Sequence, residues 1–228
     1  LELGEDIDNY DTVVRINRSC ESIKKFSKNI GSKTDVLYSC LIEKPANAGK
    51  IDIEKYLSYG IKLICVPPAS DMKGLSNKTT LHSLINIDTV KKLSEKIPVR
   101  VVDHTFHNEL ARNVDCRPNT GFMAIYDILR MQPRKLAVYG FSFYLDGFIE
   151  GVKHGIKLEQ NKTEQEFANQ CYNSKRHVQK NMWAYAKETL ASNERVTTDN
   201  ILSQILKLEK LDKSLFKEKL NHDNLHTD

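Results

Sequence analysis

The feature that most constrains the fold is a repeated alternation of short apolar runs with segments of helical periodicity. The apolar runs are typical of strands and cover residues 12–16, 35–42, 61–66, 99–103, 135–139 and, as a short last candidate, 195–198. Helical periodicity falls between them, at 51–59, 88–97, 121–129 and 177–191. Strands that alternate with helices pair in parallel and carry helices on both faces. The pattern therefore predicts an α/β fold with a Rossmann-like, mostly parallel sheet.

Three further stretches lie outside this alternation. Residues 69–80 have no period and are interpreted as a loop, and residues 146–175 are too polar to assign. Residues 200–220 have the pattern of an amphipathic helix, followed by a polar tail at 221–228. Packing on the domain is the default expectation for that helix, with subunit pairing in a homo-oligomer or contact with a membrane as alternatives.

Composition excludes several classes of protein. Of the 228 residues, 40% are hydrophobic and 28% are charged, which is ordinary for a globular domain. No run of about 18 apolar residues is found, so we expect no membrane span within this chain. The net charge of +4 is mild and spread along the chain, which favours a solvated surface and no nucleic-acid partner.

The cysteines and histidines do not suggest a metal site. No CxxC pair occurs among the five scattered cysteines, and His104 and His107 lack a third ligand nearby. Unpaired cysteines favour reduced thiols and a cytoplasmic location. A Golgi or membrane-associated location, through an anchor in a missing N-terminal segment, is the alternative.

Parallel sheets bind ligands at the carboxyl ends of their strands, which directs attention to 15–19, 117–121 and 140–144. Asn119-Thr120-Gly121 precedes an apolar helix, and the unpaired N–H groups of a helix start can hold an anion. An ordinary helix cap without a ligand is the alternative. Gly140 ends an apolar run, where it permits either a tight turn or the close approach of a nucleotide.

Asn17 follows the first predicted strand, and its amide can both donate and accept, as base or sugar recognition requires. A turn-forming asparagine is the alternative. Arg15 points to the opposite face, where we expect it to pair with a carboxylate such as Asp35. His177 opens its predicted helix and is suited to accept a proton near neutrality, although a lone histidine is more often a surface or capping residue. His154 lies in the unassigned polar stretch.

Three ordered motifs resemble those of the sialyltransferase superfamily. The stretch from Gly4 through Arg15-Ile16-Asn17, followed by Gly31-Ser32-Lys33-Thr34, resembles the large sialyl motif of the animal-type enzymes. Residues 117–121 and 138–141 resemble the small sialyl motif, and the stretch from His177 to Thr197 resembles the short motif that a histidine leads. Bacterial sialyltransferases of the Campylobacter type share this order and have a Gly-x-x-Phe-Tyr turn similar to 140–144.

The resemblance implies a single-domain glycosyltransferase, a GT-A-like variant, in which residues 1–199 bind the nucleotide sugar. Its reaction in glycan biosynthesis would move a sialic acid from CMP-sialic acid to an acceptor glycan hydroxyl, with inversion and without a metal or other cofactor. His177 would be the general base. Tyr144, together with Tyr172 or His154, would stabilise the leaving phosphate. The donor would be bound by Arg15, Asn17, Asn119, Thr120, Gly121, Gly140 and Phe141.

This chain also departs from the family pattern. It starts just beyond the place of the glycine-rich loop of both families, so we expect the first strand and that loop to be missing. The cysteine of the animal-type disulfide has no counterpart at 129–131. The motifs leave open a transferase for another CMP-sugar such as Kdo and a non-catalytic nucleotide- or glycan-binding relative. A methyltransferase is a further alternative.

Overall fold

Two groups of residues, each with its own strands and its own core, make up the chain. The computed structural model describes residues 2–43, 47–68, 86–145 and 163–217. Within these residues, the first unit extends to Leu110 and the second begins at Ala111.

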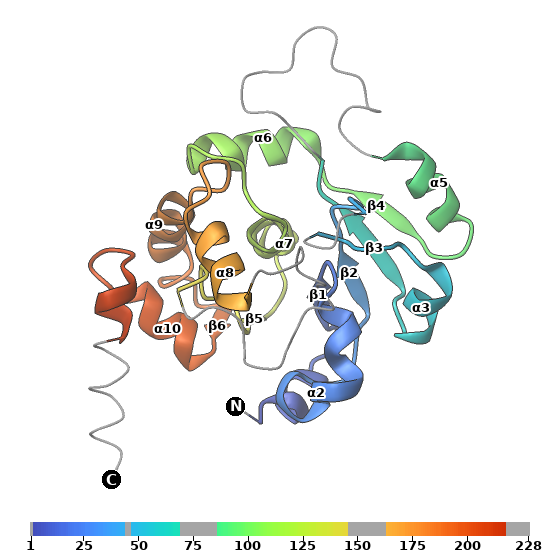
Figure 1. The fold of residues 1–228 in the computed structure, drawn as a ribbon, viewed down its shortest axis with the longest axis horizontal. Helices are drawn as coiled ribbons and strands as arrows, with labels where there is room; N and C mark the ends of the chain where they lie inside the picture. The colour runs from blue at the N-terminus through green and yellow to red at the C-terminus, as the bar shows by residue number, and fades with distance from the viewer. Residues whose placement is uncertain (1, 44–46, 69–85, 146–162, 218–228) are drawn as a thin grey trace, which may run out of the picture. The chain divides into compact units, whose positions relative to one another are not determined.

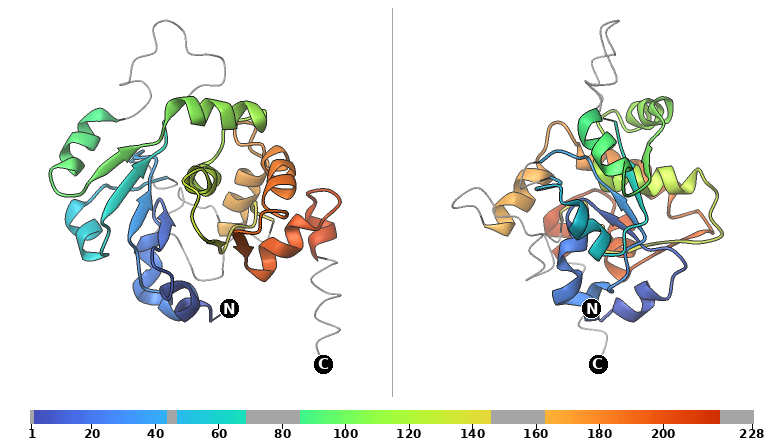
Figure 2. Two further views of the ribbon diagram at one scale, coloured as in Figure 1. Left: turned by 180° about the vertical axis from the view of Figure 1, so that it is seen from behind. Right: turned by 90° about the vertical axis from the view of Figure 1, so that its right-hand side faces the viewer.

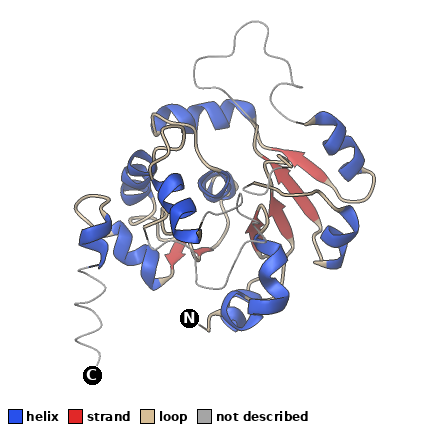
Figure 3. Cartoon of the chain, in the orientation of Figure 1, coloured by secondary structure: helices blue, strands red, loops and turns tan. Residues whose placement is uncertain are grey.

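The first unit is built on a sheet of four parallel strands that follow one another in chain order (Figures 1 and 3). These are β1 (Val14–Ile16), β2 (Val36–Tyr38), β3 (Leu63–Val66) and β4 (Val99–Val101). Each strand pairs in parallel with the next, as the alternation of apolar runs and helices predicts. The predicted α/β class with a mostly parallel sheet is therefore confirmed.

One face of this sheet packs against two of the unit's helices. These are α3 (Ile53–Ser58) and α5 (Ile87–Ser94), whose first turns are capped by the side chains of Asp52 and Asn86. Residues of β2 and β3 meet residues at or beside the two helices in one apolar cluster, which includes Leu37, Ile64, Val66, Tyr56, Leu93 and Ile97. Alternate residues of a strand face the same way, so this cluster fixes which residues point to the opposite face.

Two helices near the N-terminus pack closely, α1 (Gly4–Asp8) and α2 (Ile23–Ile30), the latter preceded by the short 3-10 helix η1 (Ser19–Ser22). They lie beside each other in both views of Figure 2. The close approach depends on Gly4, because a Cβ there would lie 2.0 Å from the Ser27 carbonyl oxygen.

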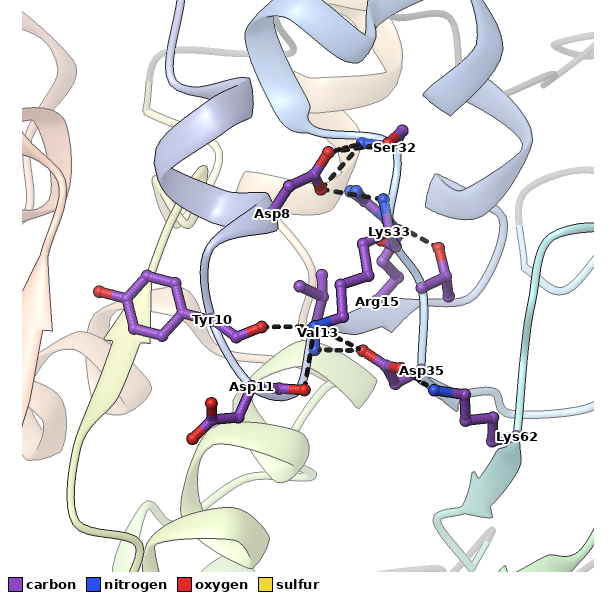
Figure 4. A network of polar contacts seen from close by, with 10 residues as sticks. Asp8, Tyr10, Asp11, Val13, Arg15, Ser32, Lys33, Asp35 and Lys62 are labelled. Atoms are coloured by element: carbon purple, nitrogen blue, oxygen red, sulfur yellow. Dashed lines mark hydrogen bonds and ion pairs between the residues drawn. The ribbon is translucent and has the colours of Figure 1, made fainter.

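A polar network joins α1, β1 and the segment from Gly31 to Asp35 (Figure 4). The Asp8 carboxylate accepts the N–H groups of Ser32 and Lys33 and the Ser32 hydroxyl. The buried Arg15 guanidinium donates to the carbonyls of Ile30, Gly31 and Lys33 and to the Thr34 hydroxyl. The network therefore holds the loop between α2 and β2 against the first strand.

The expected pairing of Arg15 with Asp35 is wrong. Asp35 accepts the N–H of Val13 over 2.9 Å and bonds Lys62 over 2.7 Å, with Lys33 at 3.7 Å. Arg15 instead turns to backbone carbonyls of the adjacent loop. Every residue has a backbone carbonyl, so the sequence does not indicate which carbonyls accept hydrogen bonds. It does show carboxylates, which is why a carboxylate was the expected partner.

The second unit contains two parallel strands, β5 (Leu136–Val138) and β6 (Val196–Thr198). Its helices are α7 (Thr120–Leu129), α8 (Glu164–Tyr172), α9 (Gln179–Thr189) and α10 (Asn200–Leu206). The core includes Phe122 and Met123 of α7, Met182 of α9 and Leu202 of α10, all with no exposed surface.

The C-terminal segment packs onto this unit and differs from the helix predicted at 200–220. Helix α10 ends at Leu206, and residues 213–217 are helical again. Three of the segment's backbone carbonyls accept side-chain hydrogen bonds, from Trp183 to Ile205, Lys187 to Leu208 and Tyr172 to Leu211. Among the described residues, no helix is long and apolar enough to cross a membrane.

Among the described residues, four α-helices were not predicted because their segments are polar: α1, α2, α8 and α6 (His104–Asn113). Local signals for two of them were nevertheless present. Asp103 accepts the N–H of Phe106 at the start of α6, and Thr163 and Glu166 form a capping box at the start of α8. The predicted loop at 69–80, the tail at 221–228 and His154 lie outside the described residues.

The polar network predicts a loss of stability in acid. Burial alone would raise the pKa of Asp8, but hydrogen bonds from Lys33 and Ser32 and the charge of Arg15 together lower it. Burial alone would likewise raise the pKa of Asp35, but the hydrogen bonds from Lys62 and Val13 outweigh this effect and lower it. The stability from both carboxylates is therefore present above their unfolded pKa, about 3.9, and is lost as pH falls through the folded pKa.

Urea unfolding between about pH 5 and 2 should show this decline. It should be shallower in Asp8→Asn and Asp35→Asn, and identical slopes in all three proteins would contradict the assignment.

Candidate functional site

In the first unit, the candidate site residue with a free hydrogen-bonding group is Asn17, directly after β1. Its backbone is left-handed, with φ of 48°, a region that asparagine tolerates better than most residues. Its N–H donates to the Tyr38 carbonyl over 2.7 Å, and its Oδ1 accepts the N–H of Cys40 over 3.1 Å. No acceptor for its Nδ2 is found in the described part of the chain, so this group is available to a ligand. Arg15, in contrast, is committed to the chain itself through its Nε and Nη2 atoms.

In the second unit, α7 begins as the sequence predicts. Asn119 is its N-cap, and the Asn119 Oδ1 accepts the N–H of Phe122 over 2.9 Å. Thr120 and Gly121 form the first turn, where backbone N–H groups point out of the helix end. A Cβ on Gly121 would lie 3.0 Å from the Phe141 ring, so the missing side chain admits this ring. The helix start and the turn after β5 are thus brought together, although they are about 20 residues apart in the chain.

The turn after β5 is held by an acidic side chain that the sequence did not single out. Gly140 has a φ of +67°, and its N–H donates to the Asp199 Oδ2 over 2.5 Å. The other oxygen of Asp199 accepts the N–H of Leu202, which caps α10. A single carboxylate thus joins this turn to the start of α10, and the Gly140 N–H is occupied by the chain itself.

Two consecutive aromatic residues in this turn adopt left-handed backbone conformations. Phe143 has a φ of 50° and Tyr144 a φ of 60°. The Phe143 side chain is buried, and its ring meets that of Phe141 edge-on, with centroids 4.9 Å apart. Such conformations cost about 1–3 kcal/mol each and concentrate at functional sites. The surrounding packing therefore holds Tyr144 in a direction that a relaxed chain does not favour.

The two candidate tyrosines have different surroundings. Burial first, and the neighbouring Cys171 second, raise the pKa of the Tyr144 hydroxyl, which donates to the Cys171 thiol. Tyr144 therefore keeps its proton at neutral pH. The Tyr172 hydroxyl donates to the Leu211 carbonyl over 3.0 Å, and the Lys213 ammonium lies over its ring. This places Tyr172 in the contact between α8 and the C-terminal segment.

His177 lies just before α9, where the chain holds both its ring and its backbone. The ring Nδ1 lies 2.7 Å from the Arg117 carbonyl oxygen, and the His177 N–H donates to the Ser174 hydroxyl over 3.1 Å. A carbonyl can only accept, so Nδ1 carries the proton. The lone pair of the neutral ring is therefore on Nε2. Helix α9 starts two residues after His177, slightly later than predicted.

The surroundings of His177 keep its ring neutral. Burial is the main cause that lowers the pKa of His177, and the charges of Arg117 and Arg176 lower it further. The hydrogen bond to the Arg117 carbonyl opposes this shift but is weaker in effect. The result is an imidazole that is unprotonated at neutral pH, with Nε2 ready to accept a proton.

The described residues show no group of three or more potential metal ligands of the His, Cys, Asp and Glu types. His104 lies near Asn108 of its own helix, and His107 is buried. The five cysteines are free thiols. Sequence reasoning missed Asp199 and the Arg117 carbonyl, since both act on residues about 60 positions away in the chain. It also missed Ser174, whose hydroxyl accepts the N–H of His177 three residues later.

Comparison with known proteins gives a family assignment. The family model described as glycosyltransferase family 29 (sialyltransferase) matches residues 1–149 of the 228. The matched range contains Asn17 and the residues from Asn119 to Tyr144, and it ends before His177. Neither a search of curated proteins nor a search of solved structures found a match.

The two bonds of Asp199 predict a specific effect of Asp199→Asn. An asparagine has one acceptor oxygen for two backbone N–H donors, so either the Gly140 turn or the α10 cap loses its bond. We expect a loss of about 1 kcal/mol in the free energy of unfolding, measured with urea. Asp52→Asn is the matched control, because Asp52 caps α3 through the N–H of Lys55, and asparagine caps a helix equally well. Equal changes in the two variants would show that the Gly140 bond contributes nothing.

Proposed function

Because the chain belongs to glycosyltransferase family 29 (sialyltransferase), we propose that it transfers a sialic acid from CMP-sialic acid to a glycan hydroxyl, with inversion and without a metal. The family itself makes the chain a sialyltransferase-type glycosyltransferase, an enzyme with a nucleotide-sugar donor and a glycan acceptor. The observation that carries the finer proposal is the His177 ring, which is held by the Arg117 carbonyl and kept neutral by burial.

In the proposed reaction, His177 is the general base. Its Nε2 accepts the proton of the acceptor hydroxyl while the hydroxyl oxygen bonds to the anomeric carbon of the sugar. The bond from that carbon to the CMP phosphate oxygen breaks, and its electron pair leaves with the phosphate. A single displacement of this kind inverts the configuration. The Arg117 carbonyl stabilises the imidazolium that forms, because it already accepts the Nδ1 proton.

The start of α7 is the proposed anion-binding element of the second unit. The Asn119 side chain occupies the N–H of Phe122, whereas among the described residues the N–H groups of Thr120 and Gly121 have no hydrogen-bond acceptor. A helix start of this kind attracts carboxylates and phosphates through its N–H groups and its dipole. We assign it to a negatively charged group of the donor, either the sugar carboxylate or the phosphate.

Tyr144 is the proposed hydrogen-bond donor to the leaving phosphate. Its raised pKa keeps the hydroxyl protonated, and in the structure this hydroxyl donates to the Cys171 thiol. Sulfur is a weak acceptor, and a phosphate oxygen is a strong one. Exchanging the first for the second therefore favours departure of CMP. Hydrogen-bond donors of this kind stabilise the negative charge on the leaving phosphate, as a metal ion does in other transferases.

In the first unit, Asn17 is the proposed contact to the nucleotide. Its Oδ1 is held by Cys40, which directs the Nδ2 group, and its left-handed backbone places it at the carboxyl end of β1. Arg15 takes part indirectly, because its bonds to the adjacent loop fix the strand that precedes Asn17. His154 and Tyr172 are not needed for this proposal, and Phe141 supports it by packing over Gly121.

The base assignment predicts that His177→Ala lowers turnover by roughly 10²–10⁴-fold. Affinity for CMP should stay nearly unchanged, because His177 is assigned to the acceptor and not to the nucleotide. Turnover is measured by CMP release from CMP-sialic acid in the presence of a glycan acceptor, and affinity by calorimetry. His104→Ala is the control and should keep wild-type turnover. Unchanged turnover in His177→Ala would remove the base assignment.

The nucleotide assignment predicts that Asn17→Asp weakens CMP binding by about tenfold, the effect of one lost hydrogen bond. Aspartate keeps the acceptor for Cys40 and tolerates the left-handed backbone, but it replaces the Nδ2 donor by an oxygen. The measurement is the rise in melting temperature that CMP produces, compared with CDP and S-adenosylmethionine. Asn86→Asp, an exchange at the α5 cap, should leave the CMP response intact. A wild-type protein that responds to S-adenosylmethionine and not to CMP would overturn the proposed donor class.

A further inference from the structure

Gln179, the first residue of α9, is a buried side chain in an unusual position. Only 2% of its surface is exposed. Its Nε2 donates to the His177 carbonyl over 2.8 Å and to the Cys171 carbonyl over 3.4 Å. Its Oε1 is buried and has no hydrogen-bond partner among the described residues. The amide nitrogen therefore makes hydrogen bonds, whereas the amide oxygen makes none within the described residues.

The orientation of this amide is fixed by its neighbours. Both partners are carbonyl oxygens, which can only accept, so a rotated amide would set its own oxygen against them. A buried amide oxygen without a donor lowers stability, and an apolar side chain of similar size would avoid that cost. The cost of this oxygen offsets part of the stability that the two N–H bonds contribute, so the net gain in stability from a glutamine at this position is small. The groups that its nitrogen bonds provide a further reason for a glutamine here.

These two bonds connect the proposed base to the proposed leaving-group donor. His177 is fixed at its ring by the Arg117 carbonyl, at its N–H by Ser174 and at its carbonyl by Gln179. Cys171 is fixed at its carbonyl by Gln179, and its thiol accepts the Tyr144 hydroxyl. One side chain thus spans the short distance between the backbone of His177 and the residue that holds Tyr144.

We propose that Gln179 is a positioning residue that sets the place of His177 relative to Tyr144 through the carbonyls of His177 and Cys171. This inference rests on the proposed function, because it assigns Gln179 a task only if those two residues act on the substrates. Gln179 touches neither substrate. It determines where Nε2 and the Tyr144 hydroxyl lie, and a misplacement of about 1 Å in such groups can cost roughly 10²-fold in rate.

The first test is Gln179→Met, which keeps the length and volume of the side chain, removes both N–H bonds and also removes the unsatisfied oxygen. The melting temperature should stay close to that of the wild type, since the loss of the unsatisfied oxygen offsets the loss of the two N–H bonds. Turnover should nevertheless fall by about 10- to 100-fold, with CMP affinity within about twofold of wild type. Gln204→Met, the same exchange at a buried glutamine of α10, is the matched control and should keep turnover.

The second test is Gln179→Glu, studied as a function of pH. An ionised carboxylate would face two carbonyl oxygens, whereas a protonated one can donate to one of them. The surroundings of a buried carboxyl group beside carbonyls favour its protonated form. The ratio of variant to wild-type turnover should therefore rise as pH is lowered, which a merely structural role does not predict.

A third readout does not depend on turnover. The pKa of the His177 ring, followed by NMR, should move upward toward its ordinary value in Gln179→Met, because a ring less firmly placed is more hydrated. Wild-type turnover and an unchanged His177 pKa in Gln179→Met would overturn the inference and leave the proposed function intact. Full activity of His177→Ala would instead overturn the proposed function, and Gln179 would lose its assigned task with it.

Discussion

The buried guanidinium of Arg15 is the interaction on which the first unit most depends. A charge taken out of water must be satisfied by hydrogen bonds, and here the carbonyls between Ile30 and Lys33 provide them. Their bonds tie the loop after α2 to the middle of β1, and Asp8 ties the same loop to α1. The end of β1, where Asn17 lies, thereby becomes a fixed point. Most of the large motif is thus used to build the unit, and one of its residues keeps a free hydrogen-bonding group in the described chain.

In the second unit, too, backbone carbonyls accept hydrogen bonds from buried side chains, and here these bonds also determine the position of a proton. The Arg117 carbonyl fixes the tautomer of His177, and the carbonyls of Cys171 and His177 fix the orientation of the Gln179 amide. The consequence is chemical as well as structural, because a neutral ring with a fixed tautomer is a base at one atom only. Folding and proton acceptance therefore depend on the same contact. The strained backbone at Phe143 and Tyr144 belongs to this unit too, where the buried Phe143 side chain holds it in place.

The sequence predicted the elements whose cause is local. The apolar runs predicted the six strands found in the described residues, and Asn119 predicted the start of α7, because β-branched residues and helix caps act over a few positions. It did not predict α6 and α8, because both segments are polar, although Asp103 and Thr163 cap them. The contacts of Arg15, His177 and Asp199 were beyond its reach. The bonds from Arg15 to Ile30, from His177 to Arg117 and from Asp199 to Gly140 join residues 15 to 60 positions apart, and each ends on a backbone atom.

The C-terminal segment is anchored through three backbone carbonyls, at Ile205, Leu208 and Leu211. This affects which substitutions the protein tolerates in evolution. Every residue type supplies the same acceptor atom at those positions. A substitution there alters packing but leaves the hydrogen bond in place, whereas a substitution of Trp183, Lys187 or Tyr172 removes it. The two sides of the contact are thus under unequal constraint. Paired substitutions between them are not expected, and a comparison of related chains that searches for such pairs would overlook the contact.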